Sequence, residues 1–232
     1  PGFTDLLLAD GMYNYWRTAI SEQVDALPSF GDHREEGLAQ MRRAATAGLL
    51  APAPARLVLT YSYLEKKDYK AAIAEAEGVR DDYPQNILVL MTLGRIYQQA
   101  RRHGDALTAF ERILEVEPKN KRVWFHIGEV HYKSRKNNKG AREAYERYLR
   151  TGPLDEYRAH TYYRLGMISR RGRDYDEAIA WFEKSLEVYP KFKKAKKQLE
   201  KAQAEKRDKP GKSTPRKGAG EGGKTRVKAG SK

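Results

Sequence analysis

The sequence predicts an all-α fold, a right-handed α-solenoid in which helical hairpins stack side by side. Apolar residues recur at helical spacing in consecutive segments that short polar breaks separate. Small residues that begin every second segment recur every 34–37 residues, and the prolines that end these segments keep the same interval. Such a period is typical of arrays in which each helical unit contacts only its neighbours. The small residues are Gly37, Ala72, Ala106, Ala141 and Ala178, and the prolines are Pro84, Pro118, Pro153 and Pro190.

The clearest unit spans residues 87–120. Leu93 and Gly94 lie on one face of a predicted first helix, and a polar break follows at 101–104. Ala106 and Phe110 then mark one face of a second helix. Pro118 ends the unit, because proline fixes its own φ and disfavours the helical conformation in the preceding residue. We expect Gly94 and Ala106 to be small because the two helices approach closely there.

These positions resemble the tetratricopeptide repeat, whose pattern is W-x2-L-G-x2-Y, then A-x3-F, then P. The resemblance covers residues 53–190 as four units in phase. The first unit departs from the pattern, with Thr60 at the glycine position and Ala76 at the phenylalanine position. The closest matches are Trp124, Gly128, Ala141, Tyr145 and Pro153 in the third unit, and Gly166, Tyr175, Ala178, Phe182 and Pro190 in the fourth.

Residues 1–50 are predicted to form a helical lead-in, a degenerate repeat that caps the array. Residues 4–27 are expected to form one amphipathic helix, capped by Thr4 or Asp5, and residues 28–31 break it. Residues 32–47 are expected to form a second helix in phase with the repeats. Because terminal repeats are commonly atypical, we interpret the two helices together as a degenerate repeat. Residues 10–16 are also similar to the lead-in of certain bacterial tetratricopeptide proteins, many of which are exported.

Residues 51–206 are predicted to hold the four repeats and a C-terminal capping helix, and residues 207–232 a disordered basic tail. Residues 137–140 read as a turn-rich insertion, and the junction at 152–157 is expected to bulge. The capping helix presents Phe192, Ala195, Leu199 and Ala202 on one face and lysines elsewhere. Beyond it, proline, glycine, serine and lysine dominate, and no apolar period remains to drive folding.

Composition limits the classes of protein that remain. The 232 residues carry a net charge of +14, most of it in residues 191–232, and contain no cysteine for a disulfide or a thiolate metal site. No apolar run approaches the roughly 18 residues that span a bilayer. The sequence begins with Pro1, so we interpret it as a fragment or a processed chain. The location therefore stays open between the cytoplasm and the bacterial cell envelope.

No motif predicts an enzyme, a metal site, a cofactor or a small-molecule substrate. Residues 211–214 end like a phosphate-binding loop, but Lys206 stands where that loop needs glycine. The glycines at 218, 220 and 223 match a dinucleotide-binding pattern without the strand and helix that this site requires. His126 and His131 are five residues apart and therefore lie on different faces of a helix.

The resemblance implies a concave groove lined by the first helix of each repeat. Its matching residues are hydrophobic and aromatic with a basic edge, which suits an extended or helical peptide with apolar anchors and acidic residues. The family also contains modules that grip the C-terminal carboxylates of heat-shock chaperones, but Leu57 and Tyr61 replace the lysine and asparagine of that clamp. The predicted groove residues are Leu57, Tyr61, Met91, Arg95, Arg122, Phe125, Tyr132, Tyr163, Met167 and Arg170.

The predicted function is a non-catalytic scaffold that binds a peptide segment of a partner protein. A second hypothesis is an electrostatic tether in which the lysine-rich end contacts nucleic acid or an anionic membrane without reading sequence. A third is a non-catalytic part of a larger multidomain protein. The groove has a competing occupant within the chain, because the lead-in helix can pack against the same exposed aromatic residues.

Overall fold

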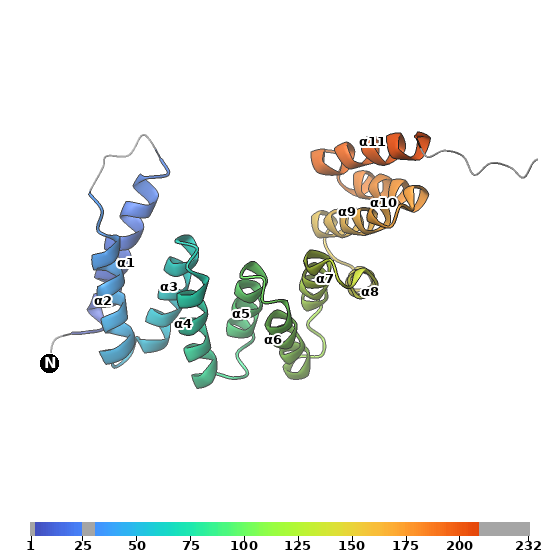
Figure 1. The fold of residues 1–232 in the computed structure, drawn as a ribbon. Helices are drawn as coiled ribbons and strands as arrows, with labels where there is room; N and C mark the ends of the chain where they lie inside the picture. The colour runs from blue at the N-terminus through green and yellow to red at the C-terminus, as the bar shows by residue number, and fades with distance from the viewer. Residues whose placement is uncertain (1–2, 25–30, 209–232) are drawn as a thin grey trace, which may run out of the picture.

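The computed structural model describes residues 3–24 and 31–208, and these residues form eleven helices and no strand (Figure 1). The all-α prediction is therefore confirmed for the described part of the chain. The helices are α1 Leu6–Ser21, α2 Arg34–Ala47, α3 Pro52–Glu65, α4 Tyr69–Asp82, α5 Ile87–Gln99, α6 His103–Val116, α7 Val123–Ser134, α8 Asn138–Leu149, α9 Asp155–Arg171, α10 Tyr175–Val188 and α11 Lys193–Arg207.

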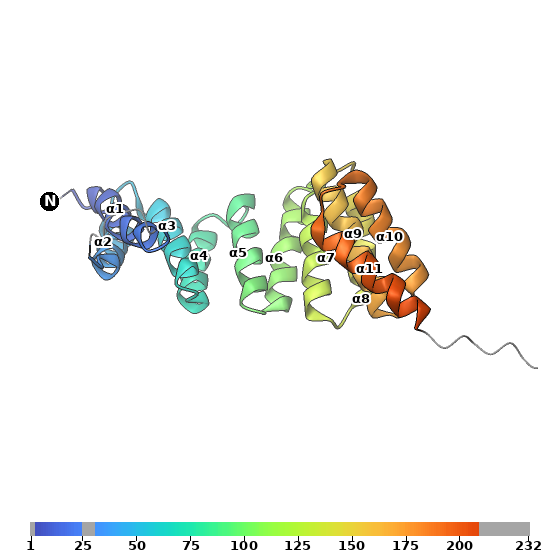
Figure 2. The same cartoon turned by 90° about the horizontal axis from the view of Figure 1, so that it is seen from above.

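The helices pair into five successive hairpins, with α11 packed on the last of them. Figure 2 shows α1 to α7 following one another from left to right, with α8 to α11 gathered at the right-hand end. Figure 1 shows the array as an arc in which α3, α5, α7 and α9 lie on the inner side and α4, α6, α8 and α10 on the outer side. Each helix packs chiefly on its sequence neighbours, which is the contact pattern of a solenoid.

Gly94 is small for a reason that differs from our expectation. A Cβ atom at Gly94 would lie 2.7 Å from Cζ of Phe110, so the absent side chain makes room for an aromatic ring rather than for a neighbouring backbone. Gly128 and Gly166 make the same room for Tyr145 and Phe182 of their own hairpins. In the second hairpin, where the aromatic position holds a small alanine, the glycine position holds a threonine, and both side chains are fully buried.

The turns inside the repeats share one backbone conformation. Lys67, Arg101, Arg135 and Arg173 occupy the same position of successive units, and all four have φ values near +60°. In two of these turns the next residue caps the following helix: Asp68 accepts from Ala71 N at 3.0 Å, and Asp174 accepts from Glu177 N at 3.1 Å. In the α7–α8 turn the cap comes one residue later, where Asn137 accepts a hydrogen bond from Gly140 N at 2.8 Å. Because of this cap, residues 138–140 form the first turn of α8, and our prediction of a turn-rich loop there is wrong.

The first hairpin is joined more tightly than the repeats. A Cβ atom at Gly11 would lie 2.7 Å from Gly37 O, so here two backbones do approach closely. Tyr15 Oη donates to Ser62 O at 2.7 Å and thereby connects α1 to α3. The helix ends at Ser21, earlier than predicted, because polar residues follow it directly. The remainder of the expected helix, at 25–27, lies outside the described residues.

Asp5 does not cap its own helix, contrary to our expectation. Its side chain makes no cap hydrogen bond to α1, and its backbone is already helical. Asp5 Oδ1 instead accepts from Leu50 N at 3.1 Å and Ala51 N at 2.9 Å, and Oδ2 accepts from Leu49 N at 3.3 Å. This carboxylate therefore satisfies backbone donors of the α2–α3 connection and fixes the lead-in hairpin to the first repeat.

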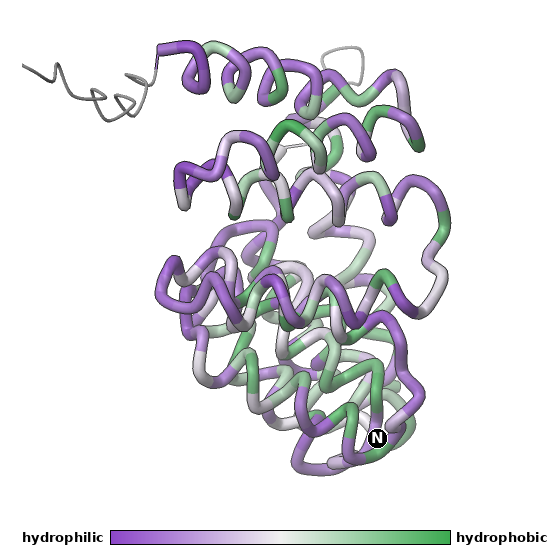
Figure 3. The backbone as a smooth tube through the Cα atoms, turned by 90° about the vertical axis from the view of Figure 1, so that its right-hand side faces the viewer, coloured by the Kyte–Doolittle hydropathy of each residue, from purple (hydrophilic) through white to green (hydrophobic). Residues whose placement is uncertain are grey.

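The C-terminal end departs from the repeat in one respect. We predicted a bulge at the longer junction before the fourth repeat. Its extra residues belong mainly to α9, which has 17 residues against 13 in α5 and 12 in α7. α11 buries Phe192, Ala195 and Ala202 as predicted and is mostly hydrophilic elsewhere (Figure 3). The predicted disordered tail falls on residues 209–232, which lie outside the described residues, and Figure 3 shows the last described turn of α11 at the end of the stack.

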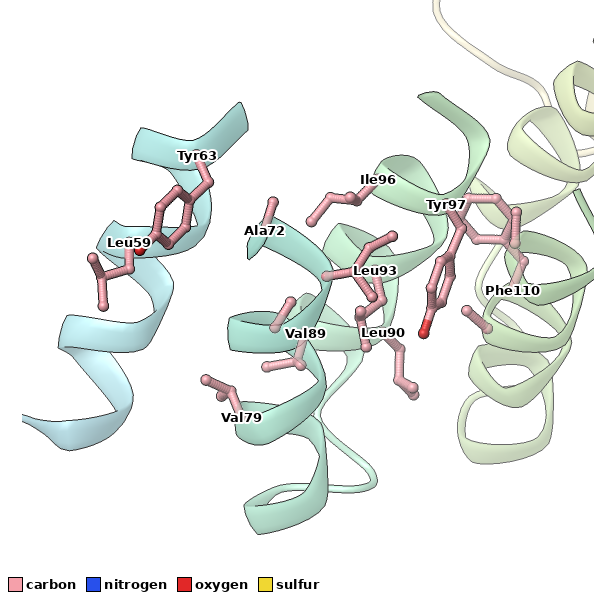
Figure 4. Packing of buried hydrophobic residues seen from close by; sticks show 14 of the residues in the cluster. Leu59, Tyr63, Ala72, Val79, Val89, Leu90, Leu93, Ile96, Tyr97 and Phe110 are labelled. Carbon is pink, nitrogen blue, oxygen red and sulfur yellow. The ribbon is translucent and has the colours of Figure 1, made fainter. Parts of the chain in front are cut away.

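The core extends along the stack as one large cluster and three smaller ones. Figure 4 shows part of the large cluster, with side chains following one another from Leu59 of α3 through Val79 of α4 and Leu93 of α5 to Phe110 of α6. Smaller clusters continue this core through α8, α9, α10 and α11. Among the described helices, none has both the length and the apolar character that crossing a bilayer requires.

Candidate functional site

The structure gathers four of the predicted groove residues around one pocket of about 560 Å³, here called the inner pocket. α5 contributes Met91 and Arg95, and the start of α7 contributes Phe125 with the preceding Arg122. Its other walls come from the end of α8 and from the α8–α9 connection. The additional lining residues are Lys121, His126, Tyr148, Thr151, Gly152, Pro153, Leu154 and Tyr157.

The apolar part of the inner pocket is built from aromatic rings. The Phe125 ring lies 5.4 Å from the ring of Tyr148 and 5.8 Å from that of His126, measured between centroids. His126 in turn stacks on the buried ring of Phe110 at 5.3 Å. These contacts hold Phe125 in place while leaving it partly exposed. Leu154 is 74% exposed at the rim, so apolar surface remains available to a ligand.

The polar part of the inner pocket is cationic. Arg95, Lys121 and Arg122 line it, and no aspartate or glutamate does. Within residues 3–24 and 31–208, these three side chains form no hydrogen bond or ion pair. A pocket that combines aromatic surface with three unneutralised cations is suited to a ligand that carries both an apolar group and an acidic group.

At the next junction along the array, between the fourth and fifth hairpins, the position equivalent to Arg95 already has partners within the chain. Glu129 replaces Arg95 at the equivalent point of the following repeat, and it is buried between two partners. Arg164 Nη2 donates to Glu129 Oε2 at 2.9 Å, and Tyr145 Oη donates to Glu129 Oε1 at 2.6 Å. Burial raises the pKa of Glu129, but its bonds to Arg164 outweigh this effect, and the net pKa lies below the usual value.

His126 occupies the place that Arg164 has at that later junction. Burial and the neighbouring Arg95 lower the pKa of His126 to about 4, so its imidazole is neutral near pH 7. The Arg95–His126 junction therefore lacks the carboxylate that completes the Glu129–Arg164 junction. An acidic group supplied from outside would provide the missing partner for Arg95.

Other predicted groove residues lie apart from this pocket. Leu57 is half-buried against the core, and Tyr61 is 49% exposed on α3. The ring of Tyr132 lies between two guanidinium groups, with Arg164 at 4.7 Å and Arg171 at 4.6 Å from its centroid. These side chains extend the inner face on either side of the pocket without lining it.

α11 covers the groove at the fourth repeat. The Tyr163 ring packs against Phe192 at 5.2 Å, and Met167 packs against apolar residues of α11. Arg170 Nη2 donates to Glu205 of α11 at 2.7 Å. The capping helix thus takes the place that a partner segment would take against these three residues. In contrast, no described residue of α1 or α2 lines the inner pocket, so the lead-in hairpin does not fill it.

Several residues of the inner pocket were not predicted from the sequence. Tyr148 belongs to a second helix, and the family pattern assigns groove positions only to first helices. Leu154 immediately precedes α9, and Tyr157 belongs to its lengthened start. The signal for them was the enlarged spacing before the fourth repeat, which we interpreted as a bulge rather than as a pocket wall. Among the described residues, no cluster of three histidine, aspartate or glutamate side chains is arranged to hold a metal ion.

Comparison with known proteins identifies tetratricopeptide repeats in two segments of the chain. Residues 91–156 and residues 159–192 each match a model of the tetratricopeptide repeat. No curated protein sequence matches the chain. Each of the solved structures compared below is less than 25% identical to this chain, so their similarity concerns the fold.

Three solved structures illustrate the similarity. MamA from Desulfovibrio magneticus RS-1 superposes with a TM-score of 0.64 at 16% identity, covering 83% of this chain and 98% of that chain. YrrB, described as a TPR protein with an unusual peptide-binding site, gives a TM-score of 0.59 at 17% identity, covering 86% and 98%. TTC0263, a thermophilic TPR protein of Thermus thermophilus, gives 0.54 at 18% identity, covering 82% and 99%.

Proposed function

Because the chain is a tetratricopeptide repeat protein, we propose that it is a non-catalytic scaffold whose inner pocket binds a peptide segment of a partner protein. The family is generally a protein-interaction fold rather than a catalytic one. The observation that carries the proposal is the pairing, in one pocket, of the partly exposed Phe125 with three cations that lack acidic partners in the described residues. The peptide-binding site of YrrB supports the proposal at the level of the fold.

The pocket chemistry defines the peptide. One apolar side chain, aromatic or long and aliphatic, fills the space between Phe125, Met91 and Tyr148. An aspartate, a glutamate or a terminal carboxylate beside it pairs with Arg95 and Arg122, because guanidinium groups bind carboxylates through two parallel hydrogen bonds. The remaining predicted groove residues, from Leu57 and Tyr61 on one side to Tyr132 on the other, extend the surface for the rest of the peptide.

A display selection tests this proposal. Random linear peptides are selected on the wild-type protein, and the enriched peptides are then measured against Arg95→Gln and Arg122→Gln, both exposed positions. We expect sequences with one apolar and one acidic residue. Each substitution should weaken them about tenfold or more, because a charge-assisted hydrogen bond contributes about 1.5–3 kcal/mol.

The matched control is Lys119→Gln, which removes an exposed cation from the same α6–α7 connection outside the pocket. It should leave peptide affinity unchanged. Peptides without acidic residues, or an equal loss in all three variants, would show that the inner pocket is not the binding site. The electrostatic tether that we predicted for residues 191–232 stays a prediction, since residues 209–232 of this segment lie outside the described residues.

A further inference from the structure

A second, chemically different surface lies along the edge where the two helices of each hairpin meet. At this edge the first helix ends and the second begins, so the turns of successive repeats follow one another. α11 runs in the direction of a first helix and also ends here, because Lys206 forms an ion pair with Asp176 at the start of α10. The edge is therefore shared by the repeats and by the last described residues of the chain.

In the third and fourth hairpins this edge is strongly basic. A pocket of about 710 Å³ separates their turns, here called the turn-edge pocket. Its lining contains three cations and polar groups, with no carboxylate and no large apolar side chain. The lining residues are Gln98, Gln99, Arg101, His103, Lys133, Ser134 and Arg135. Lys136 and Lys139, both exposed, follow immediately in the α7–α8 turn and the first turn of α8.

Hydrogen bonds make this basic edge continuous across three hairpins. Lys133 Nζ donates to Gln98 Oε1 at 3.0 Å and bridges the third and fourth hairpins. Arg171 Nη1 of the fifth hairpin donates to Asn138 Oδ1 at 3.1 Å. These two bonds tie the turns of neighbouring hairpins to one another along the edge.

Several cations and polar groups at the turn-edge pocket have no ion-pair or hydrogen-bond partner in the described residues. Within the described part of the chain, the side chains of Arg101, Arg135 and Lys136 form no hydrogen bond or ion pair that would neutralise them. Gln98 Nε2 and His103 Nδ1 are buried beside the pocket without a hydrogen-bond partner in the same described residues. Buried polar atoms are normally hydrogen-bonded, so these two atoms add to the polar rather than apolar character of the pocket surroundings.

We propose that this edge binds the phosphate backbone of a nucleic acid without reading its sequence. Arginine, lysine, glutamine and serine are the side chains that contact phosphate oxygens, and such contacts need no apolar anchor. The absence of large apolar residues from the pocket lining disfavours a protein ligand, which would need a buried hot spot. It also disfavours a membrane surface, which would gain from inserted aromatic or leucine side chains.

Fluorescence anisotropy with a labelled oligo(dT) strand and the full chain tests the proposal. The variant Arg101→Gln, Arg135→Gln, Lys136→Gln removes three cations from the basic edge. The control Arg43→Gln, Lys119→Gln, Arg150→Gln removes three exposed cations away from that edge, so both proteins have the same net charge. We expect the edge variant to bind at least about tenfold more weakly than the control, and its salt slope to fall by about 2, since each phosphate contact on a single strand contributes about 0.7.

Three results would overturn the proposal. The first is an equal loss in both variants, which would mean that total charge alone attracts the strand. The second is no measurable binding of the wild-type chain at low salt. The third is binding to phosphatidylserine vesicles that depends on the edge cations while oligo(dT) does not bind. The inner pocket is intact in both variants, so peptide binding measured in parallel should be unchanged.

Discussion

The pairing of a glycine with an aromatic ring makes a sharp prediction about stability. Gly94 of α5 faces the fully buried ring of Phe110, and an added Cβ atom would lie 2.7 Å from Cζ and 2.8 Å from Cδ1. The substitution Gly94→Ala therefore forces the ring to move. Gly94→Ala in a Phe110→Ala background places the same methyl group in empty space.

Two opposing terms determine the size of the effect. Alanine is about 1 kcal/mol better than glycine inside a helix, whereas overpacking a filled core costs about 1–3 kcal/mol. Gly94→Ala should therefore destabilise the wild-type protein by about 1 kcal/mol. Phe110→Ala alone should cost about 3–5 kcal/mol through lost burial and a cavity. In that background Gly94→Ala should stabilise by about 1 kcal/mol, so the sign of its effect reverses.

Urea denaturation followed by far-UV circular dichroism measures this double-mutant cycle. Gly104→Ala is the control, because a Cβ atom there meets nothing within 4 Å. It should be neutral or stabilising by up to about 1 kcal/mol in both backgrounds. If Gly94→Ala stabilises the wild-type protein as much as Gly104→Ala does, the ring does not account for the glycine and the reasoning fails.

Three further predictions concern charges and turns. Glu129→Gln should destabilise the array by about 3 kcal/mol, because it leaves Arg164 without its buried partner. The folded pKa of Glu129 lies below its unfolded value near 4.5, so this contribution to stability is present above pH 4.5 and is lost as the pH falls through the folded pKa. The stabilities of wild type and variant should therefore converge in acid titrations. Asp5→Ala should cost about 1–2 kcal/mol and speed hydrogen exchange at Leu49–Ala51 while the α5 amides stay protected. Unchanged exchange at Leu49–Ala51 would contradict the role of Asp5 as the acceptor for these amides. Arg101→Gly should be neutral or stabilising and Arg101→Val destabilising by about 1–2 kcal/mol in thermal melts, because φ at this residue is 61°; equal melting temperatures would contradict this.

The fold was predictable from the sequence because each repeat carries its own signals. Proline at the end of each unit and small residues at the packing positions are local features, and they repeat four times in phase. The boundaries failed where a side chain acts at a distance. Asp5 looks like a cap for the helix beside it, yet its carboxylate binds amides more than forty residues later. Asn137 is a local case: by accepting from Gly140 N it converts an apparent loop into the first turn of α8.

The site was only partly predictable, because the family pattern assigns groove positions without saying which of them stay open. Met91, Arg95, Arg122 and Phe125 do line one pocket. Tyr163, Met167 and Arg170 fit the pattern equally well, but the capping helix packs on them. Which positions a terminal helix covers depends on how it docks, and neither residue type nor spacing in the repeat encodes that docking.

The inner pocket exists where the repetition breaks, and this is the reason to place function there. A strictly periodic array would give every junction the same partner pairs, and the Glu129–Arg164 bond shows how such a junction closes. One junction earlier the carboxylate is replaced by Arg95, and the lengthened start of α9 adds Tyr157 as a wall. The first change removes an ion pair within the chain, and the second leaves apolar surface in solvent. Because the two departures converge on one pocket, they support our proposal that a ligand completes both.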